Sequence, residues 1–206
     1  MRPTKYLCLL LLWLAAPLAA QNRVLDLDGQ ESYVHLPGHI FDGLEEATVE
    51  AWVKWEEWGY FSQWFSFGTD DRWKAMGVNH WGLLPLLQFF IYNGPYELHL
   101  VRLAVGESVG QWYHLTAVSG AGGMRFYVNG VLVGNHSYAG SFAAMGGNPD
   151  NYLGKSNWEG NAYFHGQLDE VRVWSVSRSG AEIGAGMAQR LRGDVKRLKL
   201  GHEARD

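Results

Sequence analysis

Tryptophan and asparagine stand at positions where they could bind a sugar. A sugar-binding surface needs exposed aromatic rings, together with amide or carboxylate groups that bond to hydroxyls. The residues that fit this requirement are Trp58, Trp73, Trp81, Asn93 and Trp158. The alternative is that tryptophan fills the core, and we expect that position for Trp52, Trp112 and Trp174.

The sequence contains none of the common catalytic motifs. It has no Gly-x-Ser-x-Gly nucleophile elbow, no glycine-rich phosphate loop and no His-Glu-x-x-His zinc motif. The histidines are scattered, and Pro37 prevents the helix that would bring His35 and His39 onto one face. We therefore predict a protein without catalytic residues or enzymatic activity.

The first segment, residues 1–20, has the features of a secretory signal peptide. It combines a basic start, an apolar stretch over residues 7–18 and small residues before Gln21. The apolar stretch is shorter than the ~20 residues that a membrane-spanning helix needs. Cys8, the only cysteine, lies inside this segment. We therefore predict a secreted, periplasmic or cell-surface protein that folds without a disulfide.

The charge balance excludes two classes of partner. Of the 17 lysines and arginines, two lie in the signal segment, so 15 remain against 21 acidic residues. An acidic chain is poorly suited to nucleic acid or to an anionic membrane. No later segment is long and apolar enough to cross a bilayer, so we predict no membrane span in the mature chain.

Short alternating segments dominate residues 22–190 and indicate an all-β sandwich of two antiparallel sheets. Asn129-Gly130 suits both positive-φ positions of a type I′ hairpin turn. The expected strands are 24–28, 32–36, 47–55, 61–68, 74–79, 86–92, 97–103, 111–119, 124–129, 131–135, 151–154 and 165–174. A short helix is expected over residues 181–192, and 191–206 is a polar tail with a possible last strand at 195–200.

The order of several motifs resembles that of a known family. They are Leu27-Asp28-Gly29, Thr48 to Val53, Gln111 to Val118, Phe126 to Gly130 and Gly166 to Trp174. Together they resemble a laminin-G-like jelly-roll domain of the concanavalin A-like lectin/glucanase superfamily, over about residues 22–190. The resemblance implies a jelly roll with a closing strand after the helix. The tail lacks the usual residues of that strand, so we expect either a short strand at 195–200 or a chain that stops early, as a truncated product or one module of a longer protein would.

The resemblance also implies a structural calcium ion that joins Asp28 and Gly29 to Asp169. Calcium takes six to eight oxygen ligands, and no continuous calcium loop is present here. The alternative is that Asp28 accepts hydrogen bonds from its own turn and that Asp169 is a surface residue. Relatives that hydrolyse β-glucans carry Glu-x-Asp-x-x-Glu on one strand, whereas this chain has Gln167, Asp169 and Arg172 at those positions.

The sequence thus favours an exported, non-catalytic recognition module that binds carbohydrate or a glycosylated or protein partner. A second interpretation is a structural, sensor or adhesion domain of a surface protein with no ligand of its own. A glycoside hydrolase is third, because two of the three acids that the hydrolytic motif requires are absent.

Overall fold

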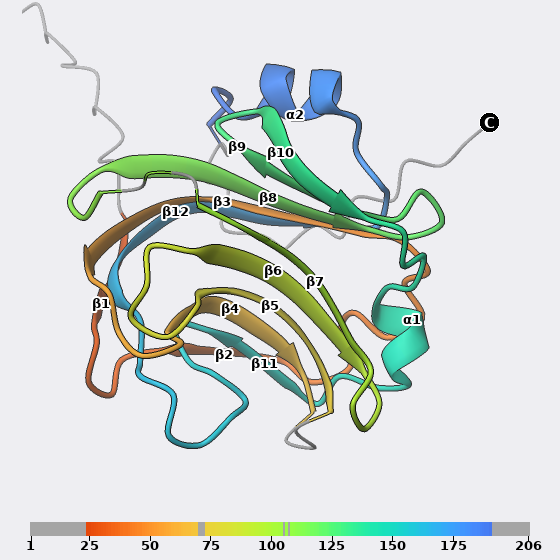
Figure 1. Cartoon of the computed structure of the whole chain (residues 1–206), viewed down its shortest axis with the longest axis horizontal. Coiled ribbons are helices and arrows are strands. Elements are labelled where there is room, and N and C mark those ends of the chain that lie inside the picture. Colours follow the sequence, from red (N-terminus) through yellow and green to blue (C-terminus); the bar gives the residue numbers. More distant parts are fainter. Residues whose placement is uncertain (1–23, 70–72, 105, 107, 191–206) are drawn as a thin grey trace, which may run out of the picture.

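Two six-stranded antiparallel sheets form the protein (Figure 1). The computed structural model describes residues 24–69, 73–104, 106 and 108–190. The first sheet has the order β1-β12-β3-β8-β9-β10, and the second has the order β2-β11-β4-β5-β6-β7. The predicted all-β jelly-roll sandwich is therefore confirmed, while the predicted signal peptide and polar tail lie outside the described residues.

The strands follow the predicted segments closely. In the first sheet they are β1 (Leu25–Asp28), β3 (Ala47–Glu57), β8 (Trp112–Ser119), β9 (Met124–Val128), β10 (Val131–His136) and β12 (His165–Trp174). In the second sheet they are β2 (Val34–Leu36), β4 (Gln63–Gly68), β5 (Lys74–His80), β6 (Leu87–Asn93), β7 (Leu98–Leu103) and β11 (Asp150–Leu153). Two short helices are present, α1 (Phe142–Met145) and α2 (Gly180–Gly186).

Alternation along the strands places the core between the sheets. Val49, Ala51 and Val53 of β3 are fully buried there, as are Phe65 and Phe67 of β4. The β9–β10 hairpin has positive φ at both Asn129 and Gly130, as the type I′ prediction requires. Each fully buried Val or Phe side chain contributes roughly 1.5–3 kcal/mol of hydrophobic free energy, so this core is the main stabilising term.

Three tryptophans predicted to lie in the core lie instead on the outer face of the first sheet. Trp52, Trp112 and Trp174 are half-buried, and none is among the buried core residues. Alternation explains the error for Trp52, because Val53 beside it points inward and Trp52 must therefore point outward. The core tryptophans are Trp55 and Trp64, which are 1% and 0% exposed.

Helix α2 covers part of this outer face. Ser179 is its N-cap residue and forms a capping box with Glu182. The capping box supplies hydrogen bonds to backbone N–H groups that have no partner within the helix. It ends at Gly186, earlier than the predicted helix over 181–192, because glycine is a poor helix former. No helix among residues 24–69, 73–104 and 108–190 is long and apolar enough to span a membrane.

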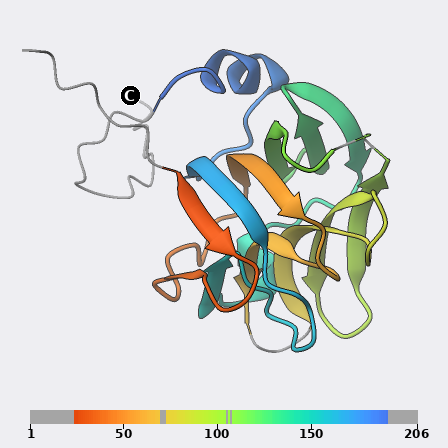
Figure 2. The same ribbon diagram turned by 90° about the vertical axis from the view of Figure 1, so that its left-hand side faces the viewer.

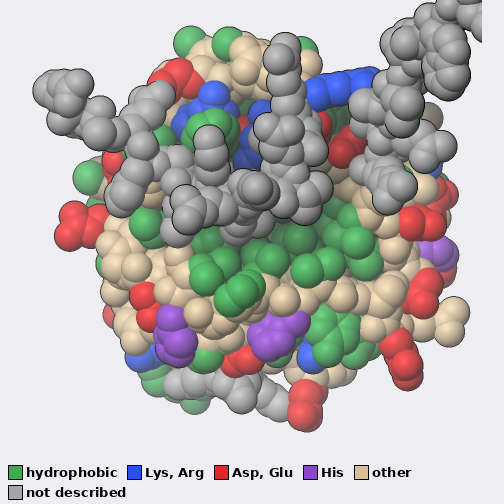
Figure 3. Space-filling view, turned by 180° about the vertical axis from the view of Figure 1, so that it is seen from behind, with side chains coloured by type: hydrophobic (Ala, Val, Ile, Leu, Met, Phe, Trp, Pro, Cys, Tyr) green, Lys and Arg blue, Asp and Glu red, His purple; other side chains and the backbone are tan. Residues whose placement is uncertain are grey.

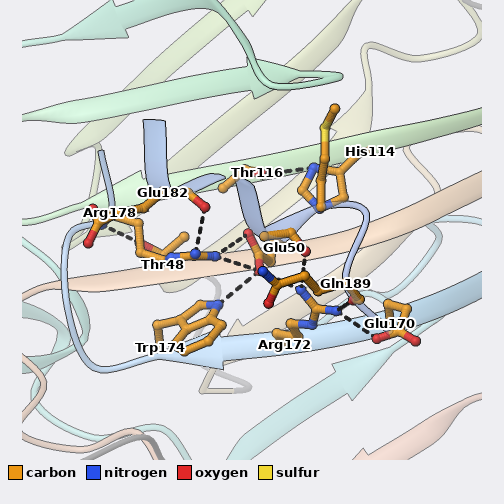
Figure 4. Close-up of polar contacts among 12 residues, drawn as sticks. Thr48, Glu50, His114, Thr116, Glu170, Arg172, Trp174, Arg178, Glu182 and Gln189 are labelled. Atoms are coloured by element: carbon orange, nitrogen blue, oxygen red, sulfur yellow. Dashed lines mark hydrogen bonds and ion pairs between the residues drawn. The ribbon is translucent and has the colours of Figure 1, made fainter. Parts of the chain in front are cut away.

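A buried charge cluster joins α2 to the first sheet (Figure 4). Glu50 of β3 is fully buried, and its carboxylate accepts hydrogen bonds from Arg178 at 2.9 and 3.2 Å and from the Trp174 indole at 3.0 Å. Arg172 lies 3.4 Å from the same carboxylate and also donates to the backbone carbonyl oxygens of Gly186, at 3.0 Å, and of Gln189. We call Glu50, Arg172, Trp174 and Arg178 the Glu50 cluster.

The side of the sandwich that is hidden in Figure 1 carries one edge strand of each sheet, β1 and β2. Hydrophobic side chains are visible in the middle of this side (Figure 3). The edge strands β1 and β2 contribute the half-buried Leu25, Val34 and Leu36 to the core cluster. The strand that would close this edge, predicted at 195–200, lies outside the described residues.

Candidate ligand-binding site

A hollow of about 480 Å³ opens beside the loop 155–163, which crosses the outer face of the second sheet. We call it the loop hollow. Its lining combines aromatic rings with amide, carboxylate and ammonium groups, from Asp150, Tyr152, Lys155, Ser156, Asn157, Trp158, Glu159, Gly160, Asn161 and Tyr163. This mixture of flat apolar surfaces and convergent hydrogen-bonding groups is typical of a site for a small polar ligand.

Strand β4 holds the loop in place from below. The Ser156 hydroxyl oxygen accepts hydrogen bonds from the Gln63 side-chain amide at 2.8 Å, the Asn161 side-chain amide at 2.9 Å and the Trp158 backbone N–H at 3.0 Å. The Ser66 hydroxyl donates to the Asn157 side-chain oxygen. These contacts bury the polar outer face of β4, whose six residues are all buried. The walls of the hollow are thus fixed before any ligand arrives.

Tyrosine rings and one lysine make the wall nearest β2. The ring centroids of Tyr33 and Tyr152 lie 5.7 Å apart in an edge-to-face arrangement, and those of Tyr33 and Tyr163 lie 6.1 Å apart. The Lys155 ammonium lies 4.8 Å from the Tyr33 ring and 4.6 Å from the Tyr152 ring. Cation–π attraction therefore holds the lysine against the rings, where it can donate to a ligand oxygen.

Two of the predicted sugar-binding tryptophans come together around Tyr92. Trp158 lines the loop hollow, and its ring centroid lies 5.3 Å from that of Tyr92. Trp73 lies 5.9 Å from the same tyrosine, on the other side. Asn93 follows Tyr92 on β6, where its backbone N–H donates to Glu97. Burial raises the pKa of the Tyr92 hydroxyl, which moves its ionisation still further above neutral pH.

The other two predicted tryptophans lie away from the hollow. Trp58 is half-buried and packs against His80, with ring centroids 5.2 Å apart. Trp81 lies at the start of the β5–β6 loop, with the Arg102 guanidinium 3.7 Å from its ring centroid. The structure therefore groups Trp73 and Trp158 and separates them from Trp58 and Trp81.

The residues of the predicted calcium site do not meet in one coordination sphere. Asp28 Oδ1 accepts hydrogen bonds from the backbone of Gln30, Glu31 and Ser32 and from the Ser32 hydroxyl at 2.6 Å. These bonds hold the pKa of Asp28 well below its usual range. Asp28 pairs with His165, so Asp169 lies four residues further along β12, about 13 Å away. Gly29 has φ +72° at the turn, where an added Cβ would meet His165.

No cluster of three or more potential metal ligands occurs among the residues that the structure describes. Because this arrangement gives Asp28 a role in its own turn, we expect the Asp28→Ala variant to melt at a lower temperature than wild type, by the same amount in calcium and in EDTA. Differential scanning calorimetry measures both. A calcium-dependent rise in melting temperature that disappears in Asp28→Ala would instead establish the predicted site.

Several residues of the hollow were not predicted from the sequence. They are Asp150, Tyr152, Lys155, Asn157, Asn161 and Tyr163, together with Tyr33, whose ring packs against that of Tyr152. Alternation offered a signal for Tyr152, because Asn151 and Leu153 on either side of it are buried and the tyrosine must face outward. The approach of Tyr33 depends instead on the pairing of β2 with β11, which no short segment specifies.

Comparisons with known proteins agree on the fold. The chain matches the family model described as the Concanavalin A-like lectin/glucanases superfamily over residues 28–184. It is similar to domain 4 of AbnA, a GH43 extracellular arabinanase from Geobacillus stearothermophilus, in complex with arabinotriose. The identity is 23% and the TM-score 0.64, over 79% of this chain and 75% of that chain.

Two further solved structures are similar. One is the Ruminococcus gnavus IT-sialidase CBM40 bound to α2,3-sialyllactose, with 13% identity and a TM-score of 0.60, over 76% of this chain and 96% of that chain. The other is a SAP-like pentraxin from Limulus polyphemus, with 17% identity and a TM-score of 0.54, over 73% and 70% of the two chains. No curated protein matches this sequence significantly. At these identities the similar structures establish the fold alone.

Proposed function

Since the chain belongs to the concanavalin A-like lectin/glucanase superfamily, we propose that its loop hollow binds a carbohydrate and that the protein is an exported, non-catalytic recognition module. The observation that carries this proposal is the composition of the hollow. Trp158, Tyr152 and Tyr163 offer ring faces, and Asp150, Asn157, Asn161 and Lys155 offer hydrogen-bonding groups beside them. Sugars present both kinds of surface, because C–H groups cover one face of the ring and hydroxyls surround it.

The similar structures support the same class of ligand. Two of them were solved with oligosaccharides, arabinotriose in one and sialyllactose in the other. These sugars belong to those proteins, and they serve here as the first probes. The proposed ligand is a short oligosaccharide, either free or displayed on a glycoprotein.

Calorimetric titration with arabinotriose and sialyllactose, after a glycan array to widen the choice, tests the proposal. We expect Trp158→Ala to weaken binding by about 30-fold or more, because buried tryptophans at binding sites contribute about 2 kcal/mol or more. The matched control is Trp81→Ala, a tryptophan of the β5–β6 loop that does not line the hollow, and it is expected to leave the affinity unchanged. Equal losses in both variants would contradict a site at the hollow.

A domain without a ligand of its own is the alternative, and a folded protein that binds no glycan on the array would favour it. Hydrolytic activity needs a test of its own. The hollow contains two carboxylates, Asp150 and Glu159, and glycoside hydrolysis uses a pair of carboxylates. We expect no release of reducing ends from any glycan that binds. Release that disappears in Asp150→Asn would assign the protein to the hydrolases instead.

A further inference from the structure

Large apolar side chains are exposed together at one end of the sandwich. Tyr60 follows β3, and Trp81, Leu83 and Leu84 lie in the loop between β5 and β6. Their exposed fractions are 54%, 37%, 64% and 51% in that order. The two loops lie at the left of Figure 1 and face the viewer in Figure 2, and the Phe61 N–H joins them by donating to the Gly82 carbonyl oxygen at 3.2 Å. We call these four residues the apolar tip.

The segments around the apolar tip carry no formal charge. Residues 58–69 and 75–96 contain no aspartate, glutamate, lysine or arginine. Protein–protein interfaces usually surround an apolar centre with a polar rim. Four side chains also expose only a few hundred Å², whereas a stable protein interface buries about 800 Å² on each partner. The tip is therefore too small for a typical protein partner.

Amphipathic rings and one cation accompany the leucines. The rings of Tyr60 and Phe61 are 4.8 Å apart, and those of Phe61 and Trp81 are 5.1 Å apart. The exposed Arg102 covers the Trp81 ring and donates to the Gln88 side chain at 3.0 Å. Leucine suits the acyl chains of a bilayer, tyrosine and tryptophan suit the headgroup boundary, and arginine suits lipid phosphate, so the tip and Arg102 offer a side chain for each layer.

From this arrangement we propose that the apolar tip inserts into the surface of a lipid bilayer. Leu83 and Leu84 would enter the acyl boundary, the Trp81 and Tyr60 rings would lie at headgroup depth, and Arg102 would meet a lipid phosphate. The acidic balance of the chain gives no general attraction to anionic lipid, so the matching surface is a zwitterionic one such as phosphatidylcholine. This inference does not depend on carbohydrate binding. However, the Ala162 N–H donates to the Tyr60 carbonyl oxygen at 2.9 Å, which places the loop of the hollow beside the tip.

Sedimentation with phosphatidylcholine vesicles tests the proposal with the mature full-length chain. We expect wild type to sediment with the vesicles and Leu83→Ser/Leu84→Ser to lose at least about 30-fold in partitioning, because the substitutions remove the two side chains that would enter the acyl boundary. The matched control is Val131→Ser/Leu132→Ser on the edge strand β10, where the exposed fractions are 64% and 47%. This control is expected to sediment like wild type.

Three outcomes would overturn the proposal. They are no sedimentation of folded wild type, an equal loss in both double variants, and sedimentation only when anionic lipid is added. Analytical ultracentrifugation adds a fourth, namely a dimer that Leu83→Ser/Leu84→Ser abolishes, which would assign the tip to a second copy of the chain. Tryptophan emission checks the geometry, because insertion of Trp81 shifts it to shorter wavelength and Trp81→Phe removes that shift.

Discussion

Replacing Glu50 with alanine is expected to lower the free energy of unfolding by about 3–5 kcal/mol, because the substitution leaves charge buried without its partner. Glu50 is fully buried, and the side chains of Arg172 and Arg178 around it are only 8% and 12% exposed. For a domain of this size the loss corresponds to a fall in melting temperature of roughly 6–20 °C. Thermal melting followed by circular dichroism measures it.

The control for this variant is Glu56→Ala. Glu56 forms a 2.7 Å ion pair with Lys54 on the same strand, but its side chain is 41% exposed. Exposed pairs contribute about 1 kcal/mol or less, so we expect little change in the melting temperature. If Glu50→Ala melted as close to wild type as Glu56→Ala does, the cluster would not hold α2 to the sheet in the way the hydrogen bonds indicate.

The second large effect is a loss of stability in mild acid that depends on His80. This side chain is fully buried at the end of β5, its ring centroid lies 4.8 Å from that of Trp55, and neither ring nitrogen has a hydrogen-bond partner among the described residues. Burial lowers the pKa of His80 to about 4 from its ordinary value of 6.5. Between pH 6.5 and about 4, His80 therefore binds a proton in the unfolded chain but not in the folded chain.

The sign of the effect follows from proton linkage. The contribution of His80 is fully present above pH 6.5 and is lost progressively as the pH falls toward 4, with about 2–3 kcal/mol gone by pH 4.5. Carboxylates with a lowered pKa, such as Asp28 and Asp42, lose their contribution as the pH falls below their ordinary value of 3.8, outside most of this window. Urea unfolding at pH 7 and pH 4.5 measures the difference between wild type and His80→Phe.

We expect His80→Phe to lose about 2–3 kcal/mol less than wild type between the two pH values. The pKa values of His99 and His114 are also lowered, first by burial, so the variant keeps part of the acid sensitivity. His165→Gln is the control, since the His165 side chain is 42% exposed. An identical pH dependence for wild type and His80→Phe would show that the buried ring already shares its site with water or a proton donor.

Local rules were enough to predict an all-β sandwich of two sheets, and the family resemblance added the jelly-roll topology. Period-two alternation places Val49, Ala51 and Val53 in the core, and Asn129-Gly130 forms the turn that its chemistry favours. The same rule puts Trp52 on the opposite face of the strand, and the prediction that Trp52 lies in the core is wrong because it gave the size of the ring more weight than the alternation. Helix α2 was located by its change of pattern, and its end at Gly186 reflects a glycine that the sequence also shows.

The candidate site was only partly predictable, for a physical reason. Trp158 could be chosen because an aromatic residue between polar neighbours in a loop suits sugar binding. Tyr33 and Lys155 could not, because their contact depends on β2 lying next to β11, a pairing between segments more than 100 residues apart. Gln63 likewise gains its role only when the loop folds back over β4. The positions of these side chains depend on pairing between distant segments, which cannot be read from the sequence alone.

The contacts of the Glu50 cluster also indicate where the folded domain ends along the chain. The family match stops at residue 184, yet Arg172 donates to the carbonyl oxygens of Gly186 and Gln189, and the Trp52 indole donates to that of Met187 at 3.0 Å. A protein cut at the end of the family match would keep all the strands found in residues 24–190 and lose these three acceptors. The smallest fragment that folds to full stability must therefore extend at least to Gln189, five residues beyond the last residue of the family match.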